Sequence, residues 1–117
     1  MPAFLTPQQL YEALETCVLD SLAIDVNART ARLELHVVNG GTRHEHSLTF
    51  ASVARFTVDR PSTAPWDYVE LSEIIVEPSK KSPGQWRFWA ELWSKNSIEV
   101  IADRVLFDGS ELRKGAA

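Results

Sequence analysis

The chain has 117 residues, of which 44% are hydrophobic and 24% charged, and its formal net charge at pH 7 is −4. This composition excludes an intrinsically disordered chain and predicts one globular domain over residues 1–117, large enough to enclose a core. The acidic balance, with no basic run longer than Lys80-Lys81, argues against binding to nucleic acid.

The single cysteine, Cys17, excludes an intramolecular disulfide and a cysteine metal cluster. No apolar segment is long enough to span a bilayer, and residues 1–4 lack the features of a signal peptide. We therefore expect a cytoplasmic protein that works in a reducing compartment and does not associate with membranes.

A short helix is predicted near the N-terminus, over about residues 6–16. Thr6 suits the N-cap, Pro7 suits the first helical position, and Gln9 has the spacing of a capping box. Leu10 and Leu14 lie one turn apart and form an apolar stripe. We expect this helix to pack on a sheet.

Period-two patterns of apolar residues occur from about residue 18 to residue 107 and predict about six strands. Gly40-Gly41 is the strongest hairpin signal, because glycine accepts the positive φ angles of a tight turn. The stretch from Ser47 to Asp59 is either one long bent strand or two strands broken near Ala51-Ser52.

Two changes of phase, at Ser72-Glu73 and at Asp103-Arg104, indicate β-bulges that bend the strands. Short sequential connections favour an antiparallel meander. The predicted fold class is α+β, mainly β, with one N-terminal helix packed on a strongly bent antiparallel sheet or half-open barrel of about six strands. Residues 109–117 are expected to form a frayed tail.

The most informative segment is a predicted hairpin from Trp86 to Phe107. Its first strand alternates between two sets of side chains, Trp86, Phe88, Ala90 and Leu92 on one face and Arg87, Trp89, Glu91 and Trp93 on the other. A strand that is apolar on both faces is typical of a covered strand or an interface. Two registers are open at the turn over 94–97, one pairing Trp89 with Ala102 and the other pairing Ala90 with Ala102.

His44 and His46 lie two residues apart and could converge on a metal ion from one strand. If the preceding turn has two residues, His44 lies opposite Val37 and His46 opposite Leu35, which leaves His36 on the other face. Only two ligands can be named, fewer than a catalytic or structural zinc site needs. We therefore expect no metal and no other cofactor.

The acidic residues of 67–77 alternate with apolar residues and are typical of a solvated sheet face. Neither a nucleophile elbow nor a glycine-rich phosphate loop is present. No catalytic residue is assigned, and the protein is expected not to be an enzyme. A hydrolytic or metal-dependent enzyme built on His44 and His46 stays open as the third interpretation.

Three stretches carry a resemblance to known proteins. They are LTFASVARFTVDR (48–60), DYVELSEIIVE (67–77) and SIEVIADRVLF (97–107). The pattern lies in Phe50, Val53 and Phe56, then Leu71 and Ile74, then Ile98, Val100 and Val105. It resembles a loose group of short uncharacterised bacterial proteins, some of them suspected immunity proteins of polymorphic toxin systems. The resemblance implies no catalytic residue.

Together these features predict a non-enzymatic protein-binding domain, of the kind found in immunity-like bacterial accessory proteins. The predicted binding residues are Arg87, Trp89, Glu91 and Trp93. Tryptophan and arginine are enriched in binding hot spots, so this face is expected to cover a protein partner or a second copy of the chain in a dimer. The alternative is a small-ligand carrier whose curled sheet encloses an aromatic cavity lined by Trp86 and Phe88.

Overall fold

The computed structural model describes residues 4–59, 69–81, 83–92 and 95–113. It confirms a mainly β fold with one short helix, but the sheet has eight strands where about six were predicted. The elements in chain order are β1 (Phe4–Leu5), α1 (Pro7–Leu14), β2 (Val18–Asp25), β3 (Thr30–Asn39), β4 (Thr42–Asp59), β5 (Leu71–Pro78), β6 (Trp86–Leu92), β7 (Asn96–Phe107) and β8 (Ser110–Leu112).

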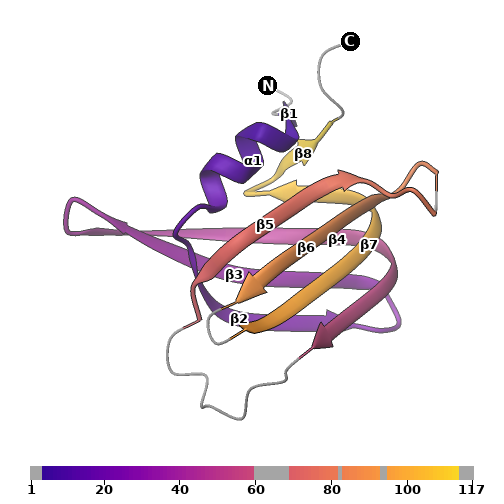
Figure 1. The fold of residues 1–117 in the computed structure, drawn as a ribbon, viewed down its shortest axis with the longest axis horizontal. Helices are drawn as coiled ribbons and strands as arrows, with labels where there is room; N and C mark the ends of the chain where they lie inside the picture. The colour runs from indigo at the N-terminus through magenta and orange to yellow at the C-terminus, as the bar shows by residue number, and fades with distance from the viewer. Residues whose placement is uncertain (1–3, 60–68, 82, 93–94, 114–117) are drawn as a thin grey trace.

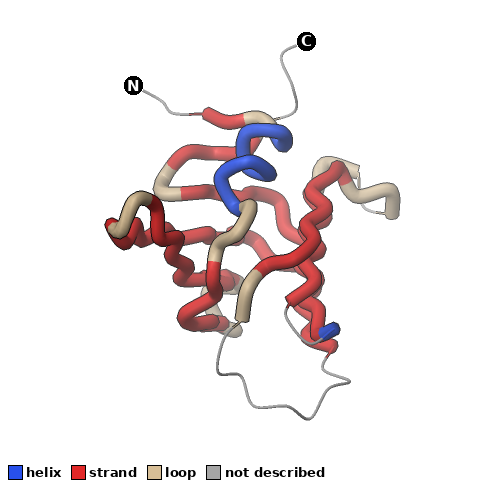
Figure 2. Tube along the Cα trace, turned by 60° about the vertical axis from the view of Figure 1, so that its left-hand side comes forward, coloured by secondary structure: helices blue, strands red, loops and turns tan. Residues whose placement is uncertain are grey.

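The sheet runs in the order β5-β6-β7-β4-β3-β2 and curls strongly without closing (Figures 1 and 2). Within the described ranges the two edges meet at one end, where Val18 bridges Glu70 and the Leu19 N–H donates to the carbonyl oxygen of Val69 at 2.7 Å. β8 pairs with the end of β7, and β1 pairs with β8 in parallel. The described sheet is therefore mixed but mainly antiparallel, as predicted, and the β1–β8 pair is its parallel part.

The two strands missed by the sequence analysis are the shortest ones. β1 has two residues and β8 has three, too few to show a periodic pattern. Residues 110–112 were expected in a frayed tail, but Glu111 pairs with both Leu106 and Phe4. Pairing between the two chain ends holds this segment in place.

The β3–β4 hairpin agrees with its sequence signal. Gly40 and Gly41 have φ angles of 60° and 80°, as a two-residue turn with two left-handed positions requires. Of the two alternatives for the following stretch, the single long strand is correct, because β4 runs for 18 residues. It bends near Ser52, which has a φ of 54°.

Both predicted changes of phase are present. The pairing of β5 with β6 shifts between Leu71 and Glu73, which confirms a bulge at Ser72. In β7 two successive exposed residues, Asp103 and Arg104, separate buried Ala102 from buried Val105. The register shift itself lies on β4, between Val53 and Arg55, so the bulge predicted at Asp103-Arg104 is on the neighbouring strand instead. Such shifts increase local twist and let the sheet curl.

The register of the β6–β7 hairpin differs from both predicted registers. Ala102 pairs with Trp86, and Ala90 pairs with Ile98. The reason is that Asn96, expected in the turn, is buried and begins β7 opposite Leu92. The inward and outward residues of β6 are nevertheless those predicted from its alternation.

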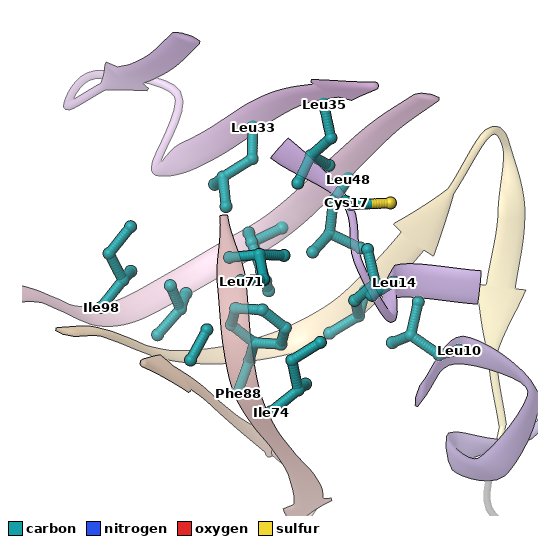
Figure 3. Packing of buried hydrophobic residues seen from close by; sticks show 14 of the residues in the cluster. Leu10, Leu14, Cys17, Leu33, Leu35, Leu48, Leu71, Ile74, Phe88 and Ile98 are labelled. Carbon is teal, nitrogen blue, oxygen red and sulfur yellow. The ribbon is translucent and has the colours of Figure 1, made fainter. Parts of the chain in front are cut away.

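α1 closes one end of the curled sheet (Figure 1). The predicted capping box is present, since the Gln9 N–H donates to the Thr6 hydroxyl and the Thr6 N–H donates to Oε1 of Gln9 at 2.8 Å. Leu10 and Leu14 are both fully buried and point into the core (Figure 3).

The core lies inside the curl and joins all parts of the sheet. Phe88 of β6 is fully buried and its ring lies 5.2 Å from the ring of Phe50 on β4, tilted by 55°. Figure 3 shows Leu33 of β3, Leu48 of β4 and Leu71 of β5 approaching this centre. Tilted aromatic pairs at this separation add stabilisation beyond that of area burial.

Replacing Phe88 with alanine is expected to destabilise the fold by about 3–5 kcal/mol, because the cavity left in a packed core collapses only partly. The matched control is Phe4→Ala, since Phe4 is 50% exposed and is expected to lose about 1 kcal/mol. Urea unfolding of both variants measures the difference. Equal losses would contradict the central position of Phe88.

Cys17 belongs to the same core. Its side chain is fully buried and its Sγ lies 3.3 Å from the carbonyl oxygen of Ala13. Burial, with a smaller contribution from the negative charge of Asp108, raises the pKa of the Cys17 thiol to about 11. The group is thus an inert apolar side chain in the folded protein.

The folded protein is expected to react with a thiol reagent such as DTNB at pH 8 at least about 100-fold more slowly than the urea-unfolded chain. Its thiolate population is lower by about that factor, and burial restricts access further. A stopped-flow comparison measures both rates. Comparable rates in the two states would show that Cys17 is accessible.

The same raised pKa predicts a loss of stability in alkali. Below pH 9 the Cys17 thiol is neutral in both the folded and the unfolded chain and has no effect on pH dependence. From about pH 9 to about pH 11 only the unfolded chain ionises, so the free energy of unfolding falls. Urea titrations should show this extra fall in the wild type and not in Cys17→Ala.

Candidate protein-binding face

β6 presents two different faces because its side chains alternate. Trp86, Phe88, Ala90 and Leu92 are buried in the core, whereas Arg87, Trp89 and Glu91 are partly exposed on the outer side of the sheet. The structure thus places three of the four predicted binding residues together on one surface. The fourth, Trp93, lies outside the described residues.

Cross-strand pairing arranges the outer side of β5, β6, β7 and β4 in three rows, which we call the outer face. The first row is Glu77, Arg87, Ile101 and Arg55; the second is Ile75, Trp89, Glu99 and Thr57; the third is Glu73, Glu91, Ser97 and Asp59. Directly opposed residues in an antiparallel pair lie on the same side, so each row is a line of neighbouring side chains.

Arg87 is held by two carboxylates. Its Nε donates to Glu99 at 2.8 Å and its Nη1 donates to Glu77 at 3.3 Å. The Nε of Arg55 lies 4.0 Å from the other oxygen of Glu99. Ion pairs at a surface add little stability, but two of them on one guanidinium fix its orientation.

Trp89 occupies the middle row, between Ile75 and Glu99. All three side chains are partly buried, so the ring packs on the sheet and still presents surface to solvent. A rigid aromatic side chain of this kind gives a large contact area at a low cost in conformational entropy.

A pocket of about 420 Å³ lies beside the first row. Its lining residues are Ala54, Arg55, Glu77, Ser79, Lys80, Lys81, Arg87, Glu99 and Ile101. Four of these residues are basic and two are acidic. The sequence analysis noted Lys80-Lys81 only as the longest basic run. The sequence signal that could have indicated this pocket was the position of the two lysines in the loop between two predicted strands.

We call this side of the outer face the basic end, defined by Arg55, Arg87, Lys80 and Lys81. The opposite row forms the acidic end, defined by Asp59, Glu73 and Glu91. Glu73 and Glu91 are direct cross-strand neighbours, and two like charges in directly opposed positions are destabilising. The face therefore changes sign along its strands, with Trp89 between the two ends.

The aromatic cavity of the ligand-carrier interpretation would need Trp86 and Phe88 to line an open space. Trp86 is 7% exposed and Phe88 is fully buried against Phe50. Both side chains therefore act as core packing. Trp66, the remaining tryptophan, lies outside the described residues.

The predicted cross-strand partners of the histidines are correct: His44 pairs with Val37 and His46 with Leu35. The Nδ1 of His46 lies 2.6 Å from Asp108, and its ring stacks on Phe107 at 5.0 Å. Within the described ranges, no group of three or more potential ligands could hold a metal ion. No helix in the described part of the chain is long and apolar enough to cross a bilayer.

A second hollow, of about 270 Å³, lies between the β2–β3 turn and the middle of β4 and was not anticipated from the sequence. Ile24 and Val26 border it and are 50% and 81% exposed. They continue the period-two pattern of β2 beyond the core, which explains why alternation alone did not distinguish them from buried residues.

Comparison with known proteins adds information on the fold. The crystal structure of an uncharacterized protein from Neisseria gonorrhoeae is similar to this chain, with a TM-score of 0.60 and 12% sequence identity over 80% of this chain and 91% of that one. No protein-family model matches the chain, and no curated protein matches it. At this level of identity the similarity concerns the architecture of the sheet alone.

Proposed function

We propose that the protein is a non-enzymatic protein-binding domain that recognises its partner with the outer face. The observation that carries the proposal is the position of Trp89. It is anchored on a strand whose other side is the packed core, and it stands at the centre of a face with charged rows on both sides. Central tryptophans surrounded by polar residues are typical of binding hot spots.

The rigidity of the face supports this role. β6 lies between β5 and β7, and Phe88 and Ala90 anchor it in the core on both sides of Trp89. The ion pairs of Arg87 hold the adjacent row in one arrangement. A preformed surface loses little conformational entropy on binding, so more of the contact energy appears as affinity.

The mechanism would be occlusion, in which the face covers a surface of the partner. This agrees with the resemblance to immunity-type bacterial proteins and requires no catalytic group. In this proposal the protein acts in a reducing compartment such as the cytoplasm, which agrees with Cys17 being a free thiol.

A photo-crosslinking experiment tests the proposal. A benzophenone amino acid replaces Glu91 on the outer face, or Glu45 as a control, whose side chain is 78% exposed near the β3–β4 turn. In cells of the organism that encodes the chain, Glu91 is expected to give a discrete protein adduct and Glu45 none. Adding Trp89→Ala should reduce the adduct at least about tenfold, because losing a hot-spot residue costs about 2 kcal/mol or more.

Thermal unfolding followed by circular dichroism verifies that Trp89→Ala is folded. An adduct that forms equally from both positions, or one that persists in folded Trp89→Ala, would contradict binding through this face.

A further inference from the structure

The charge pattern of the outer face indicates which partner fits it. Along the strands the face passes from the acidic end, through Trp89 and Ile75, to the basic end. The two ends are separated by only the middle row. A partner of uniform charge would be attracted at one end and repelled at the other, so the matching surface must carry the reverse gradient.

A second copy of the chain carries that reverse gradient if it is turned over. A two-fold axis in the plane of the face, running across the strands at the row of Trp89, reverses the strand direction of the second copy. This rotation sets the acidic end of each copy over the basic end of the other and brings the two Trp89 side chains together. An isologous contact of this type gives a closed assembly of two subunits.

We propose that the outer face binds a second copy of the chain in this antiparallel, face-to-face arrangement. This inference rests on the proposed function and identifies the partner as the protein itself. Glu73 and Glu91 of one copy enter the 420 Å³ pocket of the other, beside Lys80 and Lys81. Within the described part of the chain no ion pair holds either lysine, so both ammonium groups can pair with the second copy.

The pairing would relieve an unfavourable contact in the monomer. Glu73 and Glu91 are adjacent like charges, and each gains a cation when the second copy docks. The net charge of −4 per chain opposes association at long range, but salt at physiological concentration screens charges beyond about 8 Å. Short-range complementarity then decides the geometry.

The size of the face sets the strength of the dimer. Four strands and three rows span about 20 Å by about 20 Å, or about 400 Å² on each copy. Stable interfaces bury about 800 Å² of accessible surface per partner. We therefore expect a reversible dimer with a dissociation constant in the micromolar range, weakened by salt.

Sedimentation equilibrium of the full chain, from about 1 µM to about 500 µM, should show a monomer–dimer equilibrium. Trp89→Ala and the double variant E73K/E91K should each weaken dimerisation at least about tenfold. The control is E12K/E45K, which changes the net charge equally on α1 and on the start of β4, away from the outer face. It should dimerise at least as well as the wild type.

A charge-swap pair tests whether attraction between oppositely charged outer faces drives the association. E73K/E91K has a basic outer face, and K80E/K81E has an acidic one, so each is expected to be monomeric alone. Mixed together they should form a one-to-one heterodimer, because each lysine-bearing end then meets a glutamate-bearing end. Different mass tags identify the mixed species by native mass spectrometry, and circular dichroism confirms folding.

A wild-type chain that stays monomeric at about 500 µM would overturn the proposal. So would a mixture that does not associate, or an E12K/E45K control that loses dimerisation as E73K/E91K does. The crosslinking experiment separates the two proposals. Adducts of Glu91 with a different protein, together with a monomeric wild type, would refute self-association and leave the protein-binding function standing.

Discussion

The contact between Phe50 and Phe88 is the constraint on which the rest of the structure depends. These rings come from β4 and β6, which both pair with β7 and would lie about 10 Å apart in a flat sheet. A ring separation of 5.2 Å requires the inner faces of the two strands to lean toward each other. The bulge at Ser72 and the register shift at Val53 supply the local bending that makes this possible.

The curl of the sheet determines which side chains remain outside the core. Once Phe88 and Ala90 are buried, the period-two geometry of β6 leaves Arg87, Trp89 and Glu91 no position except the outer face. Antiparallel pairing then sets their neighbours on β5 and β7, so the three rows follow from the core and not from contacts among the outer residues. The arrangement of the candidate site is therefore a consequence of core packing. Because the packed core fixes the strands, the site is rigid.

Sequence reasoning succeeded where a feature depends on neighbouring residues and did not where it depends on distant ones. The capping box at Thr6, the turn at Gly40-Gly41 and the two faces of β6 are local patterns, and the structure confirms them. The β6–β7 register depends on burial of Asn96, and asparagine is a residue type that favours turns. β1 and β8 exist only because the chain ends meet. The pocket unites Arg55 with Lys80, 25 positions apart, through strand pairing that no local pattern encodes.

The distribution of charge on the outer face has an energetic consequence for association. At the basic end Arg87 already pairs with Glu77 and Glu99, so a surface that covers this row does not bury the Arg87 guanidinium as an unpaired charge. The unbalanced charges lie at the two ends, where water can remain and desolvation costs less. Trp89, between them, supplies the apolar contact. A partner would thus gain hydrophobic burial at the middle of the face and orientation from its ends, a combination that favours specific but reversible binding.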